Sequence, residues 1–106
     1  MTRYAKRPRD FAFMAWIKFQ QCIVCESQHQ PNFNAVYAHH AGHRAFARKA
    51  DDRTCIPLCW RHHDRGSSQS IHALGKRFWV TYGLDRTQVI AELNERYELE
   101  CGRIAA

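Results

Sequence analysis

The stretch from Thr54 to Asp64 constrains this chain more than any other part of its sequence. An apolar run becomes strongly polar there, and side chains that bind metal ions gather at the change. Two motifs upstream carry residues of the same kind, one a C-x-x-C pair and the other a pair of adjacent histidines. Together these segments predict a fold built around metal ions. Their metal-binding side chains are Cys22, Cys25, His39, His40, Cys55, Cys59, His62 and His63.

A structural zinc site is the first prediction. Two thiolates at C-x-x-C spacing can both approach one zinc ion to about 2.3 Å, and Cys22 and Cys25 form such a pair. Cys59 and His62 supply a second half, which completes a Cys3His tetrahedron. Cys55 competes with His62 as a ligand, and we favour His62 because a turn entering a helix suits a zinc knuckle better than a strand. A redox role for Cys22 and Cys25 is the alternative.

Length and composition limit the class of protein. A chain of 106 residues forms one domain with a small core, which a bound metal would stabilise. Its 16 Lys and Arg residues exceed its 10 Asp and Glu residues, which favours a polyanionic partner, nucleic acid above all. The five cysteines do not have the spacing of a secreted disulfide framework. With no apolar leader and no membrane-length run, we expect a cytoplasmic protein without a membrane partner.

Hydrophobic periodicity and turn residues predict an α+β domain. The segment from Asp10 to about residue 21 is apolar nearly all round, so we expect a buried helix capped by Asp10. Asp85 opens the last helix with a capping-box pattern. The single domain 1–106 would comprise a basic arm over 1–9, a metal-binding centre over 22–65 and C-terminal helices over 70–101. Within these parts we expect strands over 35–40 and 54–58, a basic loop over 42–53, a helix beginning near Cys59 and one helix over 70–83.

The remaining histidines suggest a second, catalytic metal site. His39, His40, His63 and His72 are left once the zinc ligands are assigned. Hydrolysis of a phosphodiester needs a metal ion to stabilise charge and a base to activate water. Imidazole can serve in either role near pH 7. A regular strand would point His39 and His40 to opposite faces, so both serve one site only if the strand ends or bulges there.

The order of these motifs resembles the HNH, or ββα-metal (His-Me finger), nucleases. It is more closely similar to the phage RecA-dependent recombination-enhancement nucleases. The resemblance implies a small zinc-stabilised ββα-metal core with flanking N-terminal and C-terminal helices, acting as a metal-dependent DNA endonuclease with a recombinase filament as a partner. The motifs that carry it are Cys22-Ile23-Val24-Cys25, Ala38-His39-His40, Ile56-Pro57-Leu58-Cys59-Trp60-Arg61-His62-His63, Ile71 to Trp79 and Tyr82-Gly83.

The same resemblance implies the role of each histidine. His39, His63 and His72 would hold the catalytic ion, and His40 would be the general base. The ion would be Mg²⁺ or Mn²⁺, with Zn²⁺ also compatible with three imidazoles. The zinc ligands of the family fall on Cys22, Cys25, Cys59 and His62.

The sequence departs from the motif at one position. Thr54 stands where the middle Asn would help to position the base, so a catalytically decayed, zinc-stabilised nucleic-acid-binding or adaptor module is the alternative function. Asp52 is a candidate carboxylate for orienting a histidine, and a solvated loop charge is the other interpretation.

Basic residues around the histidines predict contacts with the DNA backbone. Such contacts give affinity without reading sequence, so low sequence specificity is expected, on single- or double-stranded DNA. The candidates are Arg44, Arg48, Lys49, Arg53, Arg61 and Arg65.

Overall fold

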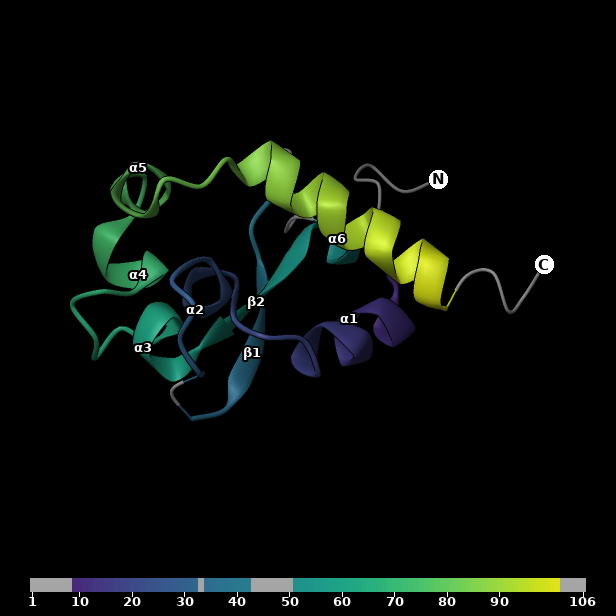
Figure 1. Cartoon of the computed structure of the whole chain (residues 1–106), viewed down its shortest axis with the longest axis horizontal. Coiled ribbons are helices and arrows are strands. Elements are labelled where there is room, and N and C mark those ends of the chain that lie inside the picture. Colours follow the sequence, from purple (N-terminus) through teal and green to yellow (C-terminus); the bar gives the residue numbers. More distant parts are fainter. Residues whose placement is uncertain (1–8, 33, 43–50, 102–106) are drawn as a thin grey trace, which may run out of the picture.

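A two-stranded antiparallel sheet lies at the centre of the molecule, with helices around it (Figure 1). The computed structural model describes residues 9–32, 34–42 and 51–101. The architecture is α+β, as predicted. The elements are α1 (Phe11–Lys18), α2 (Ile23–Ser27), β1 (Val36–His40), the short 3-10 helix η1 (Asp52–Thr54), β2 (Cys55–Cys59), α3 (Trp60–His63), α4 (Ile71–Leu74), α5 (Arg77–Tyr82) and α6 (Arg86–Glu100).

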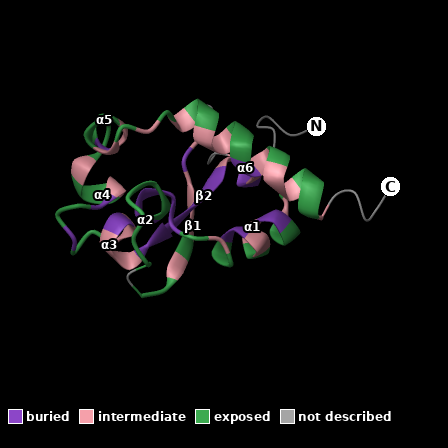
Figure 2. Ribbon diagram, viewed as in Figure 1, coloured by how far each residue is buried: buried purple, intermediate pink, exposed green. Residues whose placement is uncertain are grey.

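The strands pair in a register that brings the metal-binding motifs together. Val36 lies opposite Cys59 at one end of the ladder, and His40 lies opposite Cys55 at the other. Every residue of β2 is buried, whereas β1 is partly exposed (Figure 2). A fully apolar strand such as Cys55–Cys59 is typical of one covered on both faces. Both predicted strands are therefore present, within one residue of their predicted limits.

The core forms where α1 and α6 cover the sheet. Phe13 and Ile17, one helical turn apart on α1, are fully buried, as are Ile56 and Phe78. Tyr97 of α6 meets the ring of Phe13 edge-on at 5.1 Å. Figure 1 shows α1 and α6 side by side at one end of the molecule, which is consistent with this contact.

The expectation of a helix buried all round over 10–21 is wrong. Asp10 caps α1 as predicted, by accepting a hydrogen bond from the Phe13 backbone N–H at 3.0 Å, but the helix ends at Lys18. Only the stripe through Phe13 and Ile17 faces the core. Phe11 and Phe19 are 68% and 87% exposed, because the sheet beneath is only two strands wide.

The expectation of a single helix over 70–83 is also wrong. Gly75 takes a φ of 60°, which ends α4, and α5 begins afresh at Arg77. Gly83, with a φ of 64°, ends α5 in the left-handed conformation that glycine tolerates best. The break turns the chain back over the metal-binding centre.

The last helix begins with half of the predicted capping box. The Asp85 carboxylate accepts a hydrogen bond from the Gln88 backbone N–H at 2.8 Å. The Gln88 side chain donates to Glu92 along the helix instead of reaching back to Asp85. The predicted basic arm, apart from Arg9, and most of the basic loop lie outside the described residues. Within the described part, no helix is both long and apolar enough to cross a membrane.

Candidate metal centres and histidine site

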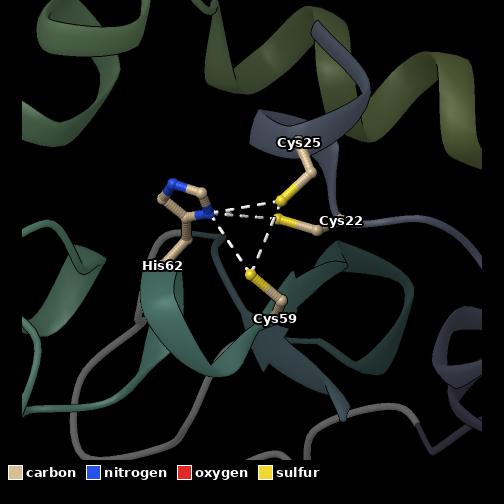
Figure 3. Close-up of side chains that lie close together, drawn as sticks. All are labelled: Cys22, Cys25, Cys59 and His62. Carbon is tan, nitrogen blue, oxygen red and sulfur yellow. Dashed lines mark hydrogen bonds between the residues drawn. The ribbon is translucent and has the colours of Figure 1, made fainter. Parts of the chain in front are cut away.

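Four buried donors converge on one point beside the start of α3. Cys22 and Cys25 come from the two ends of the first turn of α2, Cys59 ends β2, and His62 lies on α3 (Figure 3). His62 directs Nδ1 toward the three sulfur atoms, at 3.5 Å from Cys22 Sγ, 3.6 Å from Cys25 Sγ and 3.3 Å from Cys59 Sγ. The structure therefore assembles a Cys3His cluster from three elements.

The spacing of these atoms fits a tetrahedral ion. Zinc bonds of about 2.3 Å to sulfur and about 2.0 Å to nitrogen give S···N edges of about 3.5 Å in a tetrahedron. The observed edges of 3.3 to 3.6 Å bracket that value. The Cys25 and Cys59 sulfurs lie 3.6 Å apart, far beyond a disulfide bond, and both residues are free cysteines. The cluster could hold a metal ion such as zinc.

Burial sets the protonation of the thiols. Burial and the neighbouring thiols raise the pKa of Cys25 from 9.0 to about 12, and burial also raises the pKa of Cys22. A redox-active thiol needs a lowered pKa, so these shifts disfavour the redox alternative. Binding of a cation would release thiol protons, which makes loading dependent on pH.

The structure places His62, and not Cys55, beside the other three donors of the cluster. Cys55 is fully buried in β2, opposite His40, and lies outside the Cys3His cluster. His62 takes the fourth position because α3 begins directly after Cys59 and turns the imidazole back toward that thiol. Tyr82 of α5 packs edge-on against the His62 ring at 5.3 Å and closes the outer side of the cluster.

Three of the four remaining histidines form a second cluster. His39 on β1, His63 on α3 and His72 on α4 bring one ring nitrogen each within 4.8 Å of the others. Their ring centroids are 4.9 to 5.2 Å apart. The predicted ligand set for a catalytic ion is thus brought together from three elements.

The electrostatics of this second cluster favour metal binding over protonation. Burial, together with the charges that His63 and His72 would carry, lowers the pKa of His39 from 6.5 to about 4. Burial also lowers the pKa of His63, with His72 adding to the effect. A neutral imidazole offers a lone pair to a cation, so His39 needs no deprotonation before it binds one at neutral pH.

Tyr37 supports this cluster, and the sequence analysis missed it. Its ring stacks on the His63 ring, with centroids 5.0 Å apart and planes 19° from parallel. Tyr37 and His39 are two residues apart on β1 and so face the same side of the sheet. The alternation of side chains along a strand could therefore have placed Tyr37 beside His39 from the sequence alone.

His40 lies outside the three-histidine cluster and has a carboxylate partner. His39 and His40 can share a site only if the strand ends or bulges at this point. Strand β1 does end at His40, but pairing stays regular through His40, so there is no bulge. Its Nε2 atom is 2.9 Å from Oδ1 of Asp52. Both His39 and His40 nevertheless line one open groove.

Asp52 is fully buried, so the interpretation as a solvated loop charge is wrong. Its Oδ2 accepts a hydrogen bond from the Asp10 backbone N–H at 2.8 Å and pairs with the Arg9 guanidinium at 3.2 Å. The other oxygen, Oδ1, lies 2.9 Å from His40 Nε2. The buried carboxylate therefore fixes the orientation of the His40 ring.

Thr54, where the resemblance drawn from the sequence would place the motif's Asn, holds the end of β1. Its carbonyl oxygen accepts a hydrogen bond from the Ala41 backbone N–H at 3.1 Å. Gly42 approaches the Thr54 side chain so closely that a Cβ on Gly42 would lie 2.5 Å from Cγ2 of Thr54. Backbone and side chain of Thr54 thus fix the chain immediately after His40.

The predicted DNA-binding cations fall into three groups. Arg53 is engaged within the fold, 2.7 Å from Asp10 and 3.0 Å from Glu98, with its guanidinium over the rings of Phe13 and Tyr97. These partners already hold the guanidinium within the fold. A contact between Arg53 and DNA stays a prediction. Arg61 lies on α3, and Arg65 is exposed on the turn after it. Arg44, Arg48 and Lys49 lie outside the described residues.

Comparison with known proteins assigns a family but no activity. A family profile described as "Protein of unknown function (DUF968)" matches residues 3–100. The chain belongs to the DUF968 family. No curated protein and no solved structure matches it.

In this DUF968 chain, one short helix serves both clusters. His62 and His63 are adjacent on α3, and one joins the Cys3His cluster while the other joins the three-histidine cluster. Consecutive helical residues point about 100° apart, which directs the two imidazoles to different sides. The two candidate metal centres therefore share a single turn of backbone.

Proposed function

We propose that this DUF968 protein is a metal-dependent DNA endonuclease of the HNH type, with a structural Zn²⁺ at the Cys3His cluster. One observation carries the proposal. Three histidines, His39, His63 and His72, converge beside His40, whose Nε2 is held by the buried Asp52. A metal site with an adjacent oriented base is what hydrolysis of a phosphodiester requires.

The order of the elements supports the same proposal. Two antiparallel strands, β1 and β2, are followed directly by helix α3, and this unit carries the base and two of the three proposed ligands of the catalytic ion. The third, His72, lies on α4. The ββα-metal resemblance drawn from the sequence expects ligands on the first strand and on the helix. His39 and His40 are the last two residues of β1, and His63 lies on α3.

The donor set of the second cluster would accept a divalent cation. Three imidazoles suit transition metals, while Mg²⁺ or Mn²⁺ would complete its coordination with water and phosphate oxygens. A bound ion would stabilise the charge that develops on the phosphoryl group and on the leaving oxygen.

The protein's own groups account for activation of water. His40 takes a proton from water, and Asp52, whose Oδ1 lies 2.9 Å from His40 Nε2, orients the imidazole for this step. Asp52 stabilises the imidazolium that results, and its contacts with Asp10 and Arg9 keep the carboxylate in place. The hydroxide then attacks phosphorus, and the products carry 5′-phosphate and 3′-hydroxyl ends.

Contacts to the DNA backbone would come from cations on and after α3, the half-buried Arg61 and the exposed Arg65. Such contacts give salt-dependent binding with low sequence specificity. The resemblance to phage recombination nucleases makes DNA recombination the proposed setting and a recombinase filament the proposed partner.

A second candidate function rests on Thr54. The motif's Asn is absent there, and a decayed site would leave a zinc-stabilised module that binds nucleic acid without cutting it. The Thr54 carbonyl accepts the Ala41 hydrogen bond at the end of β1, but this is a main-chain contact that any residue at position 54 could make. Cleavage therefore has to separate the two functions.

Incubation with supercoiled plasmid tests the proposal. We expect nicking with Mg²⁺ or Mn²⁺ and none without added metal, and we expect His40→Asn to lower the rate by about 10²-fold or more, because general-base catalysis contributes about 10²–10⁴-fold. Zinc content and circular dichroism should be unchanged in the variant.

His29→Asn is the matched control. His29 is exposed and has a φ of 57°, a conformation that Asn tolerates. The same substitution there should leave the rate unchanged. Equal cutting by the His40 and His29 variants would refute His40 as the base, and DNA binding without cutting by any of the proteins would favour the decayed module.

A further inference from the structure

An open groove adjoins the proposed catalytic centre. It has a volume of about 550 Å³ and runs from the end of β1, past α4 and α5, to the start of α6. His39 and His40 line one part of it. Trp79, Lys76 and Arg86 line another, and none of these three was singled out as a nucleic-acid-binding residue from the sequence.

The lining combines an aromatic surface with positive charge. Trp79 is half-buried and borders the groove. Its indole also meets the Phe78 ring edge-on, with the ring centroids 5.1 Å apart. Lys76 is exposed one helical turn before Trp79, and Arg86 begins α6. Aromatic platforms flanked by cations are how proteins bind unpaired nucleic acid, because every base has a face that can stack.

The groove offers a stacking surface to an unpaired base. Its volume of about 550 Å³ is in the range of sites for one small organic molecule, comparable to a nucleotide. A base in an intact duplex is stacked on its neighbours and cannot also stack on an indole. A base in a single strand or in a locally opened duplex can do so at low cost.

We infer that this groove binds an unpaired nucleotide next to the scissile phosphate. Trp79 stacks on the base, and Lys76 and Arg86 neutralise the neighbouring phosphates. The substrate is accordingly single-stranded or locally unpaired DNA. This inference rests on the proposed nuclease function and narrows its substrate class.

Binding to labelled oligonucleotides tests the groove independently of cleavage. The probes are an oligothymidylate and a hairpin duplex, measured by fluorescence anisotropy with the zinc-loaded protein and no other divalent ion. We expect tighter binding of the single strand. Trp79→Leu should weaken that binding by about 5- to 100-fold, the range that stacking of one base supplies, while Trp79→Phe should retain most of it.

Two neighbouring residues provide matched controls. Val80→Ala changes a side chain that is 85% exposed on the same helix and is not part of the groove lining, so it should leave affinity unchanged. Lys76→Gln should reduce the slope of log affinity against log salt concentration by about one. Arg77→Gln makes the same change of charge on the adjacent residue, which does not line the groove, and should reduce the slope less. Thermal midpoints show whether each variant is folded.

The outcomes separate this inference from the proposed function. Equal affinity of the wild-type protein for duplex and single strand would overturn the groove assignment, as would a folded Trp79→Leu protein that binds the single strand like Val80→Ala. Cleavage of the plasmid would then still support a nuclease. Conversely, Trp79-dependent binding of the single strand without cutting by any metal would support the groove and overturn the nuclease.

Discussion

The protonation of single histidines decides whether this site can bind a cation. His39 is largely withdrawn from solvent, and burial lowers its pKa from 6.5 to about 4. His40, next to it in the chain, instead has a buried carboxylate at 2.9 Å. Two adjacent residues of one type thus acquire different chemistry from their surroundings, which suits one as a ligand and the other as a base.

The stability of the protein without an ion in the three-histidine cluster should depend on His39. The unfolded chain binds a proton at His39 below pH 6.5, whereas the folded chain does so only below about 4. Unfolding therefore takes up a proton within that window, and stability falls as the pH is lowered through it. In urea unfolding, the wild-type protein should lose more stability between these pH values than His39→Gln. An equal loss in both proteins would contradict the assigned pKa.

Local spacing was enough to predict the members of the Cys3His cluster. Cys22 and Cys25, and likewise Cys59 and His62, are three residues apart, so each pair is placed by a single turn. Asp52 was a candidate for orienting a histidine, but no local pattern shows that its partner is His40, because the contact joins η1 to the end of β1. Nothing in the local spacing around Trp79 shows that its side chain borders a groove.

Helix α3 is the element that couples the two centres. It is four residues long, begins directly after Cys59 and carries both His62 and His63. A helix this short has little stability of its own, so its position depends on what holds its side chains. An ion in the Cys3His cluster would fix α3 and thereby place His63 for the second cluster.

Substitution of His62 should therefore reach beyond its own cluster. We expect His62→Ala to weaken zinc binding at the Cys3His cluster. In protein that keeps zinc on its three cysteines, it should also weaken Mn²⁺ binding at the three-histidine cluster by about 10- to 100-fold, the usual effect of removing support from a metal ligand. His62→Cys retains four donors and should keep both properties. Zinc content, circular dichroism and Mn²⁺ titration measure the effects. Unchanged Mn²⁺ affinity in a folded His62→Ala protein would refute the coupling.

Element types were easier to predict than their limits and faces. The strand pair and the Asp10 and Asp85 caps follow from local pattern, and all are present. The face of α1 that is buried depends on the width of the sheet beneath it, which is a tertiary property. The helix break at Gly75 had a visible signal in the glycine itself, but a single glycine inside an apolar pattern is compatible with a continuous helix.

At the scale of the whole molecule, the cysteines form a large part of a small core. Four of them, Cys22, Cys25, Cys55 and Cys59, are buried beside residues such as Ile56 and Phe78. The sheet has only two strands, and a pair of strands alone is marginally stable. The contribution of a bound ion should therefore be large compared with that of apolar packing.

Chelation of zinc should unfold the domain. Structural zinc contributes about 10–16 kcal/mol in small zinc-binding peptides, comparable to or greater than the about 5–15 kcal/mol that separates a typical folded domain from its unfolded state. A high-affinity chelator is expected to abolish the cooperative thermal transition seen by circular dichroism, and added Zn²⁺ should restore it. A chelated protein that still melts cooperatively at an unchanged temperature would show that the core is stable without the ion.

The close approach of Gly42 to Thr54 has a consequence for the evolution of this family. A Cβ on Gly42 would lie 2.6 Å from Cβ of Thr54, so shortening the Thr54 side chain to serine or alanine would not make room for it. A side chain at position 42 therefore requires the loss of the side chain at position 54. Across DUF968 sequences we expect any residue other than glycine at position 42 to be accompanied by glycine at position 54, a pattern of covariation that an alignment of relatives would reveal without any biochemical experiment.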